Sequence, residues 1–227
     1  MTLLNSNYEQ WRQANPAASY KDFPFKASAM GNSGAMFDLA KFNDVSKNVI
    51  AHMTADEVYA FVAEWAKEND PDFYALISAD ADYLKKFLSI GRGGKKPRKD
   101  FACWSEVKDF VSYMYDALFE QKDEYPAHVS AEDRNVLLKE YAALYAPEDD
   151  NNTWFEKVKN LSEAHGYTGD MKAYKATPEA FKGSVADVSN VIRVAITGRT
   201  NSPDLCSLMA LLGKDRVTER LEKAANC

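Results

Sequence analysis

Hydrophobic residues recur at helical spacing along most of this 227-residue chain. The segment Thr-Ala-Asp-Glu that starts at Thr54 has the pattern of a capping box, and Val58, Phe61 and Val62 follow on one helical face. A similar start follows at Ser130, and no segment alternates polar and apolar residues as a half-buried strand does. The sequence therefore predicts an all-α fold.

The same patterns place several helix boundaries. An apolar stripe over 101–118 predicts one long helix, and the stretch 91–99, rich in Gly and basic residues, predicts a loop before it. Helix starts are expected at Thr153 and at Ser202–Pro203, and Pro178 is expected to begin a helix that runs, with an interruption, to Gly198. Residues 147–152 are the best candidate for a linker.

Composition excludes several classes of protein. The three cysteines are far apart and the three histidines have no metal-ligand spacing, so neither a disulfide framework nor a zinc site is expected. No nucleotide-binding glycine motif follows a strand. The start of the chain has no signal-peptide pattern, and no apolar run reaches the roughly 18 residues of a membrane span. We expect a cytoplasmic protein without a membrane segment, and no cofactor in this chain.

Charge is distributed unevenly. The net charge of −6 argues at first against a nucleic-acid partner, but residues 119–152 alone carry nine acidic and three basic groups. Residues 91–100 carry one acidic group, Asp100, and five basic ones: Arg92, Lys95, Lys96, Arg98 and Lys99. A basic loop that contains glycine suits a phosphate backbone, and a merely solvated surface loop is the alternative.

Two segments carry a resemblance to a known family. Residues 191–216 contain the pattern Arg-x-Ala-x-Thr-Gly from Arg193, Ser-Pro-x-Leu from Ser202, and Leu-Gly-Lys-x-Arg from Leu212. This combination closely resembles the anticodon-binding region of bacterial glutamyl-tRNA synthetase. Upstream, residues 33–42 resemble the stem-contact segment of the same family, although Asp44, Ser46 and Val49 depart from its usual residues.

The resemblance implies an architecture. We expect two consecutive helical-bundle subdomains of the anticodon-binding type, at 53–127 and 128–227, after the remainder of a stem-contact domain at 1–52. The catalytic signatures His-x-Gly-His and Lys-Met-Ser-Lys-Ser are absent from the sequence. The chain thus resembles the synthetase without its catalytic domain, to which ATP and Mg²⁺ binding would belong, and we expect it to be inactive alone.

The resemblance also implies site residues. It assigns anticodon contacts to Arg193, Ser202, Pro203 and Leu205, and more loosely to Arg98, which would face the first anticodon base. A helix start at Ser202–Pro203 would present free N–H groups to a base or phosphate. Core packing is the alternative role for Leu205, and a surface ion pair is the alternative for Arg193. Contacts with the RNA backbone are expected at Arg92, Lys95, Lys96, Lys99 and Arg199.

The expected partner is tRNA(Glu), with tRNA(Gln) as a second candidate, bound by a monomer. The leading alternative is a helical protein-docking module, for example one that contacts a tRNA-dependent amidotransferase. A free-standing helical protein that has lost RNA binding is a third hypothesis. Salt dependence and anticodon dependence of RNA binding would separate these three.

Overall fold

The computed structural model describes residues 6–30 and 38–226, which form two compact units, Met1–Ser46 and Lys47–Cys227. The first unit contains α1 (Tyr8–Ala14) and two single 3₁₀ turns, Tyr20–Asp22 and Ala27–Ala29. Its small core is aromatic, because the rings of Tyr8 and Trp11 both meet Phe23 edge-on at 5.2 and 5.4 Å. Residues 33–37 of the predicted stem-contact segment at 33–42 lie outside the described residues.

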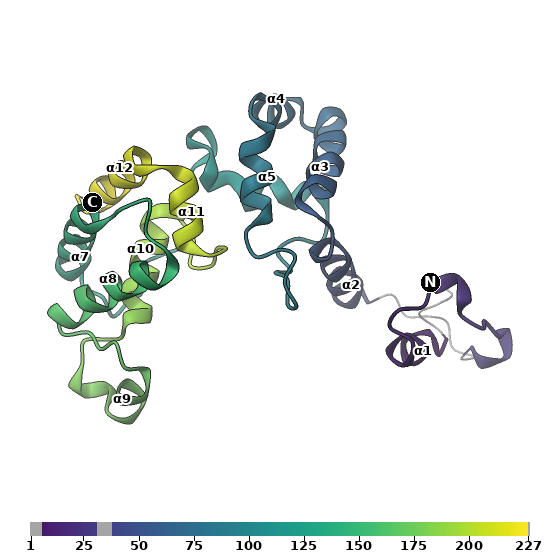
Figure 1. Cartoon of the computed structure of the whole chain (residues 1–227), viewed down its shortest axis with the longest axis horizontal. Coiled ribbons are helices and arrows are strands. Elements are labelled where there is room, and N and C mark those ends of the chain that lie inside the picture. Colours follow the sequence, from purple (N-terminus) through teal and green to yellow (C-terminus); the bar gives the residue numbers. More distant parts are fainter. Residues whose placement is uncertain (1–5, 31–37, 227) are drawn as a thin grey trace. The chain divides into compact units, whose positions relative to one another are not determined.

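The helix α2 (Leu39–Ala51) spans the boundary between the units, and the helices that follow it belong to the second unit. Figure 1 shows α3, α4 and α5 side by side, and α7, α8, α10 and α12 packed as a second group. The bounds of the helices are α3 (Ala55–Asn69), α4 (Pro71–Ala79), α5 (Ala81–Ser89), α6 (Val107–Val111), α7 (Ala131–Leu144), α8 (Asn151–Ala164), α9 (Met171–Ala176), α10 (Val185–Thr197), α11 (Leu205–Leu212) and α12 (Lys214–Ala224).

The all-α prediction is confirmed. Within the described residues, the extended backbone pairs only at an isolated bridge between Thr168 and Ser184. None of the helices in this part of the chain is long and apolar enough to cross a membrane. One hydrophobic core runs from Ile50 to Ala225 and includes residues of both expected subdomains, and the boundary between 53–127 and 128–227 stays a prediction.

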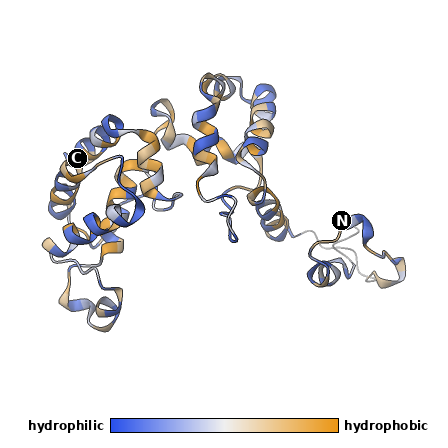
Figure 2. Cartoon of the chain, viewed as in Figure 1, coloured by the Kyte–Doolittle hydropathy of each residue, from blue (hydrophilic) through white to orange (hydrophobic). Residues whose placement is uncertain are grey.

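The central helix of the second group is α10, which contacts α7, α8 and α12 and is buried on most of its faces. The helix α11 touches both groups, since it packs on α5 as well as on α8 and α12. Figure 2 shows the contrast between the hydrophobic α10 and α11 and the hydrophilic loop that follows α5. The core therefore holds α10 and α11 in a fixed position beside that loop.

Several predicted boundaries are confirmed. Thr54 accepts from the Glu57 N–H while Glu57 accepts from the Thr54 N–H, so the capping box is present. The Ser130 side chain caps α7, and Gly198 ends α10 in the left-handed conformation with φ of 66°. Pro178 begins only a 3₁₀ turn, Pro178–Ala180, and α10 starts separately at Val185.

The prediction of one long helix over 101–118 is wrong. The segment forms α6 and three 3₁₀ turns, Trp104–Glu106, Ser112–Met114 and Asp116–Leu118, with extended backbone at Tyr115. The interruption is stable because other side chains bind the carbonyls it releases. Arg220 donates to the carbonyl of Tyr113 at 2.7 Å, and Arg216 donates to the carbonyl of Met114 at 3.2 Å.

The predicted helix start at Thr153 is also wrong. Asp150 caps α8 by accepting from the Thr153 N–H at 2.7 Å, so the helix starts at Asn151 and Thr153 lies inside its first turn. A carboxylate at this position also stabilises the positive end of the helix dipole. The connection between α7 and α8 is therefore 145–150, and the last two residues of the predicted linker at 147–152 belong to α8.

Candidate nucleic-acid interface

The basic loop 91–100 leaves α5 through Gly91, whose φ of +78° favours glycine. The backbone N–H of Arg98 donates to the carbonyl of Gly91 at 3.2 Å, which closes the loop. A Cβ on Gly91 would lie 2.9 Å from Cδ of Arg98, so the arginine stem packs directly on the glycine backbone. Lys95 and Lys96 are exposed in the closed loop.

The five basic residues of this loop have different surroundings. Arg92 points inward, where Nη1 donates to the carbonyls of Ile50 at 2.7 Å and Met53 at 3.4 Å. Its guanidinium also lies 5.7 Å from the ring centre of Phe101, and burial lowers the pKa of Arg92. Arg92 thus has an internal role, whereas Lys95, Lys96 and Lys99 are exposed.

Arg98 is held toward the loop between α10 and α11. Its Nε and Nη2 donate to Oδ1 of Asp100 at 3.0 and 2.7 Å, and Nη2 also lies 3.4 Å from Oδ1 of Asn201. The Asp100 side chain is 12% exposed and that of Arg98 is 31% exposed, so the ion pair is partly shielded from water. A forked guanidinium fixed in this way is oriented before any ligand arrives.

Arg193, on α10, reaches the same loop. Its Nη1 donates to Oγ of Ser202 and to the carbonyl of Pro203 at 3.3 Å. The pKa of Arg193 is lowered, first by burial and next by the nearby positive charge of Arg98. The fold therefore brings Arg98 to the part of the chain that carries three other predicted residues, Arg193, Ser202 and Pro203, which lie far from it in sequence.

The predicted helix start at Ser202–Pro203 is wrong. The helix α11 begins at Leu205, and Asp204 caps it by accepting from the Ser207 N–H at 2.9 Å. Because a carboxylate already occupies this helix end, its N–H groups do not form an empty anion site. Ser202 itself is buried, and Leu205, 2% exposed, lies in the core.

Arg199 follows α10 and is bound to the segment after the basic loop. Its Nη2 donates to Oδ1 of Asp109 at 2.9 Å, and Lys122 pairs with the same carboxylate. These two partners, Lys122 first, lower the pKa of Asp109 and keep it ionised. Arg199 therefore contributes to the protein's own ion pairs as well as to the positive charge of this surface.

The acidic stretch also helps to hold the loop between α10 and α11. Asp123 accepts from the N–H and the hydroxyl of Thr200 at 2.6 and 2.7 Å, which lowers the pKa of Asp123. The backbone N–H groups of Lys122 and Asp123 donate to the carbonyl of Gly198, each at 3.0 Å. Part of the negative charge of 119–152 is thus used to fix the loop that carries Ser202 and Pro203.

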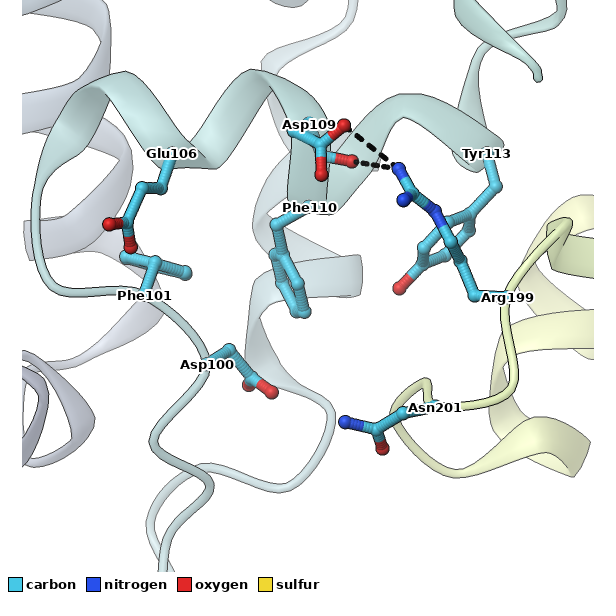
Figure 3. A pocket seen from close by; sticks show the side chains of 8 residues that line it. All are labelled: Asp100, Phe101, Glu106, Asp109, Phe110, Tyr113, Arg199 and Asn201. Carbon is cyan, nitrogen blue, oxygen red and sulfur yellow. Dashed lines mark hydrogen bonds and ion pairs between the residues drawn. The ribbon is translucent and has the colours of Figure 1, made fainter. Parts of the chain in front are cut away.

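A cavity of about 310 Å³ opens between these segments (Figure 3). Its lining consists of Asp100, Phe101, Glu106, Asp109, Phe110, Tyr113, Arg199 and Asn201. Sequence reasoning singled out only Arg199 among these as a site residue. The position of Asp100 two residues after Arg98 is a signal that could have indicated its pairing, but nothing in the sequence links Tyr113 or Asn201 to the loop. Among the described residues, no group of His, Cys, Asp and Glu is arranged to hold a metal ion.

Comparison with known proteins adds independent evidence. Residues 97–225 match the model of a family described as the anticodon-binding domain. That match covers more than half of the chain, including Arg98, Arg193 and the loop between α10 and α11. The chain belongs to this family.

Relatives of this anticodon-binding domain confirm the resemblance to glutamyl-tRNA synthetase. The chain is 44% identical to the glutamate–tRNA ligase of Acetivibrio thermocellus over 98% of its own length and 41% of that protein. It is 40% identical to the ligase of Sorangium cellulosum, over 98% of the chain and 39% of the relative. It is 38% identical to the ligase of Clostridium beijerinckii, over 100% of the chain and 42% of the relative. The chain thus spans about two fifths of the length of these relatives.

Proposed function

We propose that this chain recognises the anticodon stem-loop of tRNA(Glu) through the surface formed by residues 91–100 and 199–204. The observation that carries the proposal is the convergence of Arg98 and Arg193 on one short loop. Arg98 meets Asn201, and Arg193 meets Ser202 and Pro203, although the two arginines come from separate parts of the sequence. Membership of the anticodon-binding domain family supports the choice of RNA as the ligand.

The chemistry of the surface suits a single-stranded loop. Unpaired bases are read on their edges by arginine and by hydroxyl or backbone groups, and they stack on planar groups. Both arginines are oriented by internal hydrogen bonds, which lowers the entropy lost when RNA binds. Exposed Lys95, Lys96 and Lys99 would contact phosphates beside the bases, while the remaining net negative charge lies elsewhere on the chain.

Several finer points are part of the same proposal. The parent reaction would be the ATP-dependent attachment of glutamate to its tRNA, with ATP and Mg²⁺ bound outside this chain. We extend the RNA partner to tRNA(Gln), and we propose a cytoplasmic monomer that could also contact an amidotransferase. ATP–pyrophosphate exchange tests the first point, because formation of glutamyl-adenylate by this chain alone would contradict it.

The central experiment titrates fluorescently labelled tRNA(Glu) with the full chain at several salt concentrations. Binding should weaken steeply with salt and should weaken further when the anticodon bases are changed. Arg98→Ala and Arg193→Ala should reduce the preference for the correct anticodon by about tenfold, the effect of roughly 1.4 kcal/mol. Binding that ignores salt or the anticodon would refute the proposal and favour the protein-docking hypothesis.

A matched pair of lysine variants separates local from general charge effects. Lys95→Ala/Lys96→Ala removes two charges from the basic loop, and Lys172→Ala/Lys175→Ala removes two exposed charges on α9. Only the first variant should lower the slope of log affinity against log salt, by about 0.7–0.9 for each phosphate that the protein no longer neutralises. Equal slopes for the two variants would show that the loop does not touch the RNA.

A further inference from the structure

The loop 199–204, between α10 and α11, forms one part of the proposed RNA surface and contains no helix or strand. Arg193 contacts it at residues 202–203, and Arg98 contacts it at Asn201. Since regular backbone hydrogen bonds do not set the shape of such a loop, partners from elsewhere in the chain must do so. The position of those partners therefore decides where the loop can meet RNA.

The segment 120–123 supplies such partners at the start of the loop. One carboxylate oxygen of Asp123 accepts from both the backbone N–H and the hydroxyl of Thr200, at 2.6 and 2.7 Å. The carbonyl of Gly198 accepts from the N–H groups of Lys122 and Asp123. The backbone of the segment also packs directly on Gly198, because a Cβ there would lie 2.4 Å from one of its carbonyl oxygens. The Asp123 side chain thus extends this contact from Gly198 into the loop.

The segment is itself fixed to the core. Phe119, directly before it, has its ring centre 4.2 Å from the guanidinium of Arg220, which is buried. Lys122 pairs with Asp109 on α6, and Arg199 of the loop donates to the same carboxylate at 2.9 Å (Figure 3). The segment therefore joins the loop to a support whose position is set by the packed core.

The charge of Asp123 distinguishes it from the residues that would touch RNA. A carboxylate repels phosphate, whereas the guanidinium groups of Arg98 and Arg193 attract it. The carboxylate of Asp123 is also engaged by the two bonds from Thr200. Asp123 is therefore suited to hold the loop in place rather than to contact the ligand.

We propose that Asp123 is a positioning residue for anticodon recognition, which acts through Thr200 on the residues that follow it in the loop. The inference rests on the proposed function and adds to it a residue that contacts no RNA. Binding groups must be held within about 0.5 Å of their productive positions to be selective. Without the two bonds from Thr200, Asn201 and Ser202 would no longer be held in place, so correct and altered anticodons would be bound more alike.

The test measures binding of labelled tRNA(Glu), with its own anticodon and with altered anticodon bases, to variants of the full chain. The quantity compared is the anticodon preference, which is the ratio of the two affinities at one salt concentration. Asp123→Ala removes both bonds with Thr200, Thr200→Val removes the hydroxyl bond alone, and Thr200→Ser keeps both.

The matched control is Asp187→Ala. One carboxylate oxygen of Asp187 likewise accepts from the N–H and the hydroxyl of one residue, Ser184, at 2.7 and 2.9 Å. This pair of bonds lies at the start of α10, whereas the loop follows the end of that helix. The control therefore removes the same kind of contact at a distance from the proposed RNA surface.

Asp123→Ala should reduce the anticodon preference by about three- to tenfold, and Thr200→Val should reduce it less. Thr200→Ser and Asp187→Ala should leave the preference unchanged, although Asp187→Ala should lower the melting temperature because it removes a capping contact. The double variant Asp123→Ala/Thr200→Val should be as selective as Asp123→Ala, since both changes act on one contact. The salt slope should stay the same in all variants, because no phosphate contact is lost.

Three results would overturn the inference alone. The first is an unchanged anticodon preference in Asp123→Ala with a lowered melting temperature, which would limit Asp123 to a structural role. The second is an equal gain of affinity for both RNAs, which would show that only its charge matters. The third is an equal loss of preference in Asp187→Ala, which would show that any loss of stability has this effect. If the unmodified chain shows no anticodon preference, the proposed function itself fails and this inference fails with it.

Discussion

Arg220, in the core, and Arg98, in the candidate interface, use the same type of side chain in opposite ways. On α12, Arg220 is 8% exposed, and its donors bind the carbonyls of Tyr113 and Ile196 and the carboxylate of Asp116, each at 2.7 Å. Its guanidinium also lies 4.2 Å from the ring centre of Phe119. By contrast, Arg98 is bound by Asp100 and Asn201 but stays about one third exposed.

The difference shows how one residue type serves both the fold and the site. Around Arg220, the broken helical segment 112–118 depends on donors from α12, so the arginine replaces missing backbone hydrogen bonds. Around Arg98, the acceptors are the side chains of the partly shielded Asp100 and the exposed Asn201, and they orient the guanidinium without enclosing it. We therefore expect Arg220 to contribute mainly to the stability of the fold and Arg98 to contribute mainly to RNA binding.

The largest expected effect comes from Arg220→Met, which keeps the apolar stem but removes every donor. Two buried carbonyls would lose their partner, and the free energy of unfolding should fall by about 3 kcal/mol. Urea unfolding followed by circular dichroism measures this change. The matched variant Arg98→Met should lose less, because it leaves no buried backbone carbonyl without its donor. Similar losses of unfolding free energy for the two variants would contradict the distinction between Arg220 and Arg98.

Two left-handed glycines offer a second contrast. A Cβ on Gly198 would lie 2.4 Å from the carbonyl oxygen of Glu120 and 2.8 Å from Cα of Gln121, both in the backbone. A Cβ on Gly93, in the basic loop, would meet nothing within 4 Å. Gly198→Ala should therefore cost well above the roughly 1–2 kcal/mol of the left-handed conformation alone, and Gly93→Ala should cost no more than that. Thermal unfolding of both variants tests the order.

A third prediction concerns Arg92, which belongs to the basic loop by sequence but resembles Arg220 in its contacts. Arg92→Met should lower the free energy of unfolding by about 1–2 kcal/mol, because the carbonyls of Ile50 and Met53 lose their donor. The salt slope of RNA binding should stay unchanged. A reduced slope without a loss of stability would show instead that Arg92 contacts phosphate.

The smallest expected effect concerns pH. The pKa of Asp123 is lowered in the folded state by the two hydrogen bonds from Thr200, so its ionised form favours folding. This contribution is complete above the ordinary aspartate pKa of about 3.9 and is lost as the pH falls through the lower folded value. Asp123→Asn should therefore be less stable than the wild type from about pH 5 upward, and the gap should close on acidification. A gap that is constant down to pH 2, roughly two units below that reference value, would contradict this account.

Much of the fold could be predicted from local sequence. The apolar periodicity, the caps at Thr54 and Ser130, and the stop at Gly198 act within one helix, so a short window contains all the information they need. The prediction over 101–118 is wrong for the converse reason. Its apolar stripe fits a helix, but the arginines that stabilise the interruption lie about a hundred residues further along the chain.

The candidate site, like the fold, could be predicted from the sequence only in part. The sequence by itself determined the helical class, the family and the presence of five basic residues in one loop, because periodicity, motif spacing and charge can be read along the chain. Only the tertiary structure decided that Arg92 faces inward, that Arg98 meets Asn201 and that Tyr113 lines the same cavity as Asn201. Side-chain direction depends on which acceptors and rings the packed helices bring close, and these come from segments far apart in sequence.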